Sequence, residues 1–121
     1  MSKLILVVED QEDNRRIFRD LLTSSGYEVI EAVNGMEGVS SAENYRPDLI
    51  LMDIQLPGID GYEATRQIKA NRDLKKIPII VVTSYALSGD DLKAFDAGCD
   101  AYVAKPFSPR ELLAKIREYL P

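Results

Sequence analysis

Five short segments with strand features, each followed by a segment with helical features, are what most limits how this chain can fold. Four of them, residues 4–8, 49–52, 78–83 and 101–104, are apolar runs, and residues 27–32 form a short alternating segment. Short runs rich in Val, Ile and Leu are typical of strands buried on both faces of a parallel sheet. Residues 49–52 are the clearest example, because the turn residues Pro57 and Gly58 follow soon after them.

The segments between these runs indicate helices. Apolar residues recur at helical spacing in residues 17–22 and 112–120. Capping patterns predict the start of four helices, at Asn34, Asp60, Ser88 and Ser108. In the helix after Ser88 we expect Leu92 and Phe95 to face the core.

Alternating strands and helices predict an α/β fold, with one parallel sheet covered on both faces. Right-handed crossovers then favour a doubly wound (βα)5 sheet with five strands in the order 2-1-3-4-5. The 121 residues are enough for one core. No linker, repeat or low-complexity tract interrupts them, so we expect a single domain over residues 1–121.

Composition excludes several classes of function. The hydrophobic fraction of 45% is ordinary for a globular protein, and the net charge of −5 argues against direct DNA binding. The chain has no histidine, which excludes His-based triads, His metal sites and a phosphohistidine carrier. No apolar run approaches a membrane span, no signal peptide is evident, and Cys99 is the only cysteine. We therefore expect a cytoplasmic protein without a membrane partner.

Acidic residues follow two of the expected strands. Glu9 and Asp10 follow the first strand, and Asp53 follows the third. If these strands are neighbours, the three carboxylates converge and raise one another's pKa unless a cation joins them. A ligand set made only of oxygen atoms favours Mg²⁺. The competing interpretation is that Glu9-Asp10 caps the first helix, with Asp10, Glu12 and Asp13 complementing the helix dipole. Asp10 could serve both purposes.

The same edge of the sheet offers two further polar groups. Thr83 ends the fourth strand, and Lys105 follows the fifth. A carboxylate, a divalent cation, a hydroxyl and an ammonium group are the components of phosphoryl transfer onto a carboxylate. Taken singly, Thr83 would be a strand residue and Lys105 a surface cation, but their joint placement favours a site.

These residues together resemble the receiver domain of bacterial two-component response regulators. The motifs that carry the resemblance, which extends over residues 4–120, are Glu9-Asp10, Asp53 with Leu56-Pro57 and Gly61, Thr83-Ser84, and Lys105-Pro106. The resemblance implies a flavodoxin-like or CheY-like fold and a signalling role. It implies no enzymatic activity beyond Mg²⁺-dependent self-phosphorylation and self-dephosphorylation.

The resemblance also implies a role for each matching residue. Asp53 is the expected phosphoacceptor, with Thr83 and Lys105 beside the phosphoryl group. The expected Mg²⁺ ligands are Glu9, Asp10, Asp53 and the backbone carbonyl of Gln55. The other expected roles are a switch pair, Thr83 and Tyr102; two residues that tune phosphoryl lifetime, Gln55 and Tyr85; and a cis proline, Pro106.

The implied partners are proteins. A sensor histidine kinase or a histidine phosphotransfer protein would donate the phosphoryl group to Asp53. A downstream target protein would then read a change in the face made by the fourth helix, the fifth strand and the fifth helix. The resemblance is to stand-alone receivers, with features of the cell-division (DivK-like) type, so we expect no output domain. A domain excised from a larger regulator is the other interpretation.

Three alternatives share the expected fold. A flavodoxin-like module would bind a nucleotide or flavin, but the loop at residues 9–13 is acidic instead of rich in Gly, Ser or Thr. A hydrolase could use Asp53 as its nucleophile, but no Asp-x-Asp motif follows the first or third strand, and no cap domain is present. A receiver that only docks would have lost Asp53 or Lys105, and both are present.

Overall fold

The computed structural model describes residues 2–83 and 90–121, and within them five strands form one parallel sheet in the order β2-β1-β3-β4-β5, which confirms the expected fold. The strands are β1 (Leu4–Val8), β2 (Glu28–Ala32), β3 (Leu49–Met52), β4 (Ile79–Thr83) and β5 (Ala101–Ala104). The helices are α1 (Glu12–Ser24), α2 (Gly35–Tyr45), α3 (Gly61–Ala70), α4 (Asp90–Ala97) and α5 (Pro109–Tyr119).

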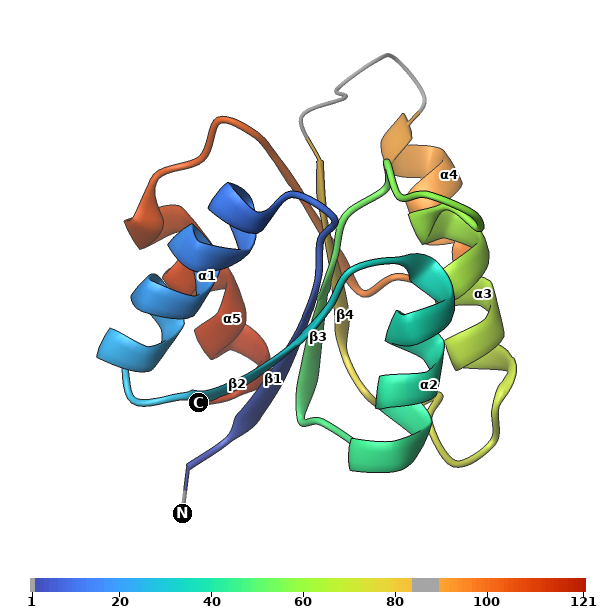
Figure 1. Cartoon of the computed structure of the whole chain (residues 1–121), viewed down its shortest axis with the longest axis horizontal. Helices are drawn as coiled ribbons and strands as arrows, with labels where there is room; N and C mark the ends of the chain where they lie inside the picture. The colour runs from blue at the N-terminus through green and yellow to red at the C-terminus, as the bar shows by residue number, and fades with distance from the viewer. Residues whose placement is uncertain (1, 84–89) are drawn as a thin grey trace.

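The helices cover both faces of the sheet. Figure 1 shows α1 and α5 on one face, and α2, α3 and α4 on the other. Alternate residues of the central strands enter two apolar cores, as expected from the side-chain period of a strand. In β3, for example, Ile50 and Met52 belong to the core under α2–α4, whereas Leu49 and Leu51 belong to the core under α1 and α5.

Local sequence explains where three of the helices begin. The side chains of Asn34, Asp60 and Ser108 each accept a hydrogen bond from the backbone N–H three residues later. These are the expected N-caps of α2, α3 and α5. Ser88, the expected cap of α4, lies outside the described residues.

The packing of α4 differs from the expectation. Leu92 and Phe95 are 66% and 48% exposed, so the prediction that they face the core is wrong. Among the residues of α4 whose side chains are described, 92–97, Ala94 and Ala97 are buried. Small side chains let α4 lie close to its neighbours, and the larger apolar side chains are left on the outer surface.

Strand pairing brings the expected site residues to one edge of the sheet. Val8 at the end of β1 pairs with Met52 at the end of β3, so Glu9 and Asp53 are the next residue on each strand. The backbone N–H of Asp53 donates to Val8 O at 3.0 Å, and that of Glu9 donates to Ala32 O at 3.0 Å. Separately, no helix in the described part of the chain is long and apolar enough to span a membrane.

Candidate functional site

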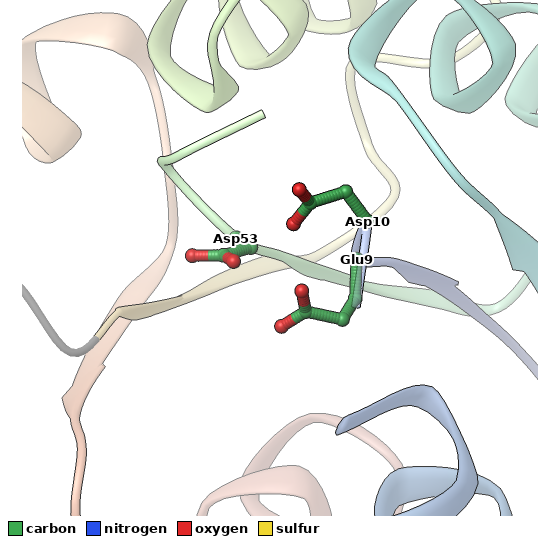
Figure 2. Close-up of side chains that lie close together, drawn as sticks. All are labelled: Glu9, Asp10 and Asp53. Carbon is green, nitrogen blue, oxygen red and sulfur yellow. The ribbon is translucent and has the colours of Figure 1, made fainter. Parts of the chain in front are cut away.

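Three carboxyl groups converge at the ends of β1 and β3. One oxygen from each of Glu9, Asp10 and Asp53 lies within 4.8 Å of the other two. Figure 2 shows the three side chains extending from the two adjacent strand ends into a common space. The convergence that the sequence predicted is therefore present.

Asp53 is half-buried at the centre of this edge. Its Oδ1 accepts a hydrogen bond from the backbone N–H of Ile54 at 2.7 Å. Burial and the negative charge of Glu9 raise the pKa of Asp53 to about 7, although Lys105 and the Ile54 N–H act in the opposite direction. Near neutral pH, a cation at this site would therefore strongly favour the ionised carboxylate.

Glu9 is only 1% exposed, yet it is held in its charged form. Its Oε1 accepts a hydrogen bond from Lys105 Nζ at 3.1 Å, and its Oε2 accepts one from the backbone N–H of Gln11 at 3.0 Å. Burial opposes ionisation, but the Gln11 N–H and the Lys105 ammonium outweigh it and lower the pKa of Glu9. Glu9 thus keeps its negative charge beside Asp53.

Asp10 does not cap the first helix. The N-cap of α1 is Gln11, whose side chain makes no capping hydrogen bond. Burial and the neighbouring Glu9 raise the pKa of Asp10 above its ordinary value, while Arg15 lowers it. The capping interpretation is therefore wrong for Asp10, and its carboxyl group is directed to the acidic cluster.

Thr83 and Lys105 lie side by side on β4 and at the end of β5. Thr83 is 1% exposed and pairs with Ala104, and the backbone N–H of Lys105 donates to Thr83 O at 2.7 Å. The Lys105 ammonium lies 5.8 Å from the centre of the Phe18 ring, which stacks on Phe107. The peptide bond between Lys105 and Pro106 is cis.

The remaining expected residues surround this group. Gln55 is exposed in the loop after β3, and Tyr102 is half-buried on β5 against the core under α2–α4. Tyr85 lies outside the described residues. Gly61 begins α3 against the backbone of Asp53: an added Cβ would overlap Asp53 O and lie 2.8 Å from Ile54 Cα. Only a residue without a side chain fits there.

Two contributors could not be identified from the sequence. Arg15 on α1 donates from Nη1 to the carbonyl oxygens of Glu9 at 2.9 Å and Asp10 at 3.0 Å. Phe18 forms the apolar surface beside Lys105. Each is an ordinary helix residue in sequence, and neither carries a local signal for these contacts.

The donor set fits a hard divalent cation. In the described part of the chain the cluster offers only oxygen atoms, from three carboxyl groups at mutual distances that one ion could bridge. Burial, and then the negative charge of Glu9, raise the pKa of Asp53, so a cation bound here would favour the ionised form of its carboxyl group. Mg²⁺ prefers such oxygen ligands and retains several waters, so the residues fit it.

Known proteins resemble this chain in sequence. The family model for the response regulator receiver domain matches residues 5–117. The polar-differentiation response regulator DivK of Brucella anthropi is 46% identical over 120 residues, which cover 99% of this chain and 98% of that protein.

Solved structures agree in fold. The receiver domain of the sensor histidine kinase PA1611 from Pseudomonas aeruginosa PAO1, with a magnesium ion coordinated in its active site cleft, has a TM-score of 0.92 and 41% identity, covering 99% of this chain and 98% of that one. A CheY-like receiver domain protein from Methanospirillum hungatei JF-1 has a TM-score of 0.92 and 37% identity, covering 99% and 94%.

Proposed function

Because this chain belongs to the response regulator receiver domain family, we propose that Asp53 accepts a phosphoryl group from a phosphohistidine. The donor would be a sensor histidine kinase or a histidine phosphotransfer protein. The observation that carries this proposal is the convergence of Glu9 and Asp10 on Asp53, within 4.8 Å, at the end of the central strand β3. Signalling by phosphorylation in two-component systems is the general function of the family.

The reaction transfers one phosphoryl group from histidine to Asp53. A carboxylate oxygen of Asp53 forms a bond to phosphorus while the bond from phosphorus to the histidine nitrogen breaks. The histidine ring, protonated at its other nitrogen, keeps the electron pair and leaves as neutral imidazole. This chain mainly positions the reactants and balances charge, as in phosphoryl transfer generally.

Glu9, Asp10, Asp53 and the backbone carbonyl of Gln55 are the groups that we propose hold Mg²⁺. When bound, the ion would supply positive charge that favours ionised Asp53 and neutralises phosphoryl oxygens. Lys105 already lies at this edge on Glu9, so its ammonium needs only a local side-chain movement to reach a phosphoryl oxygen. The hydroxyl group of Thr83, at the end of the adjacent strand, would donate a hydrogen bond to another phosphoryl oxygen.

We propose that the output is a protein contact on the face made by α4, β5 and α5. Movement of Thr83 toward the phosphoryl group would be accompanied by inward movement of Tyr102 on β5. The exposed Leu92 and Phe95 on α4 give this face an apolar surface that a downstream target could read. Phosphorylation shifts the population only as far as it favours one conformation over the other.

Residues 1–121 would act as one receiver, because the family match covers residues 5–117. Gln55 and Tyr85 would tune the lifetime of the phosphoryl group. Catalysis would be limited to self-phosphorylation with small donors and self-dephosphorylation.

Intact-mass measurement after incubation with acetyl phosphate and Mg²⁺ tests the proposal. We expect a gain of one phosphoryl group that is lost with a chelator and in Asp53→Asn. Asp73→Asn is the matched control, because Asp73 is exposed and pairs only loosely with Arg46 at 3.7 Å. Failure of the unchanged protein to gain mass, where a known receiver is labelled, would overturn the proposal.

A further inference from the structure

We infer that Arg15 is a positioning residue for the acidic cluster: it fixes the backbone that carries Glu9 and Asp10. This inference rests on the proposed function, because it assigns a role in the proposed Mg²⁺ site. The loop between β1 and α1 contains only residues 9–11. Its geometry decides where two of the three carboxyl groups lie.

Arg15 reaches back from the first turns of α1 to this loop. Its Nη1 donates to Glu9 O at 2.9 Å and to Asp10 O at 3.0 Å. One planar nitrogen thus holds two successive carbonyl groups, and the peptide unit between them is the one that joins the two acidic residues. Hydrogen bonds from a charged donor are shorter and stronger than neutral ones.

Arg15 is itself held in place from the other side. Its Nε lies 3.3 Å from Oε1 of Glu31 on β2, and its side chain is only 14% exposed. Glu31 also binds Arg19, whose Nη1 lies 2.8 Å from Oε2. The guanidinium is therefore fixed between β2 and the loop, and its five donors suit such a bridge better than an ammonium does.

Arg15 has two opposing effects on Mg²⁺ binding. Whether its replacement raises or lowers the Kd for Mg²⁺ therefore shows which effect is larger. As a nearby cation, Arg15 should weaken Mg²⁺ binding, so loss of its charge alone would tighten binding. As a positioning residue, it should strengthen binding, and groups that orient metal ligands typically contribute about 10–100-fold to affinity. Arg15→Lys keeps the charge but cannot form the bridge, so it isolates positioning.

The experiment measures Mg²⁺ binding by isothermal titration calorimetry at pH 8, without a phosphodonor, beside the melting temperature of each metal-free variant. We expect Arg15→Lys to raise the Kd for Mg²⁺ about tenfold. Arg15→Gln should also weaken binding, and Glu31→Gln should do so to a smaller extent. Arg19→Gln is the matched control, since Arg19 shares Glu31 but does not contact the loop, and its Kd should stay within about twofold.

A second readout separates positioning from general damage. In the acetyl phosphate reaction, Arg15→Lys should raise the Mg²⁺ concentration for half-maximal labelling and leave the rate at saturating Mg²⁺ nearly unchanged. If Arg15→Gln does not fold, Arg15→Lys and Glu31→Gln decide the matter. Unchanged or tighter Mg²⁺ binding in the folded Arg15 variants, or equal weakening in Arg19→Gln, would overturn this inference alone. Absence of Mg²⁺ binding by the unchanged protein would overturn both it and the proposed function.

Discussion

The ammonium group of Lys105 lies 3.1 Å from Oε1 of Glu9, a residue 96 positions earlier in the chain. This pair gives the almost fully buried Glu9 a cationic partner. The site still contains more carboxyl groups than cations, and burial together with the charge of Glu9 raises the pKa of Asp53 to about 7. The pair therefore explains how Glu9 stays ionised, whereas burial and the charge of Glu9 make Asp53 ionise less readily.

Replacing Lys105 should destabilise the protein, because the buried carboxylate of Glu9 loses its cationic partner. We expect Lys105→Met to lower the free energy of unfolding by about 1–3 kcal/mol at pH 7, because a buried carboxylate loses its partner. Lys105 lowers the pKa of Glu9, so its stabilising effect is present above the ordinary glutamate pKa and is lost as the pH falls through the lowered value. Urea unfolding at pH 7 and pH 4 should show a smaller difference at pH 4.

An exposed ion pair provides the control for that measurement. Lys115 lies 3.0 Å from Glu118 on the surface of α5. Lys115→Met should change stability by less than about 1 kcal/mol, because exposed pairs contribute little. Equal losses in the two variants would contradict a special role for the Lys105–Glu9 pair.

Removing the charge of Asp53 should stabilise the metal-free protein. The pKa of Asp53 is raised in the folded state, so its contribution to stability is full below the ordinary aspartate pKa and is lost as the pH rises through about 7. Asp53→Asn does not lose stability in this way, because the asparagine side chain does not ionise. We expect it to exceed the unchanged protein by about 1–3 kcal/mol at pH 8, with the difference shrinking toward pH 4.

Thermal unfolding with a chelator present checks this pH dependence. Asp73→Asn, on an exposed side chain, should show no comparable gain at pH 8. A stabilisation of Asp53→Asn that is the same at pH 5 and pH 8 would contradict titration of Asp53 as the cause.

Adding a methyl group at Gly61 should damage the site through the backbone. The new Cβ would overlap Asp53 O and lie 2.8 Å from Ile54 Cα, so the end of β3 or the start of α3 must shift. We expect Gly61→Ala to cost about 2–3 kcal/mol, as overpacking does, and to slow labelling by acetyl phosphate. Both effects can be measured on the same preparation.

Gly58→Ala separates this overlap from backbone strain. Gly58 has a φ of +78° but no atom within 4 Å of an added Cβ. Its replacement should cost about 1 kcal/mol through the left-handed backbone alone and leave labelling intact. Slowed labelling in Gly58→Ala as well would remove the argument for close approach at Gly61.

The sequence predicted the fold well because its local signals agree. The run at residues 49–52 is wholly buried, and capping at Asn34, Asp60 and Ser108 fixes three helix starts. Each signal depends on neighbouring residues only. The edge of the sheet where polar residues gather then follows from the parallel order of the strands.

Contacts between distant side chains could not be predicted in the same way. Nothing local indicates that Lys105 binds Glu9 in preference to Asp53, or that Arg15 reaches back to the loop before its own helix. Similarly, the outward position of Leu92 and Phe95 depends on how closely α4 packs through Ala94 and Ala97. Such choices depend on the assembled fold.

Cys99 should report unfolding and not redox chemistry. Its side chain is buried, and burial together with the charge of Asp100 raises its thiol pKa to about 11. Because the thiolate is the reactive form, we expect alkylation at pH 7.5 to be much slower in the native protein than in 6–8 M urea. Rapid native alkylation would contradict the burial of Cys99.

The most direct measurement is to locate the phosphoryl group after labelling with acetyl phosphate and Mg²⁺. Three carboxyl groups share the site, so a gain in mass alone does not distinguish Asp53 from Glu9 or Asp10. Borohydride reduction converts an aspartyl phosphate to homoserine, which peptide mass spectrometry can place in the sequence. We expect the change at Asp53 only, because Glu9 is held by Lys105 and Gln11. A label on Glu9 or Asp10, or none on Asp53, would contradict the proposed phosphoacceptor.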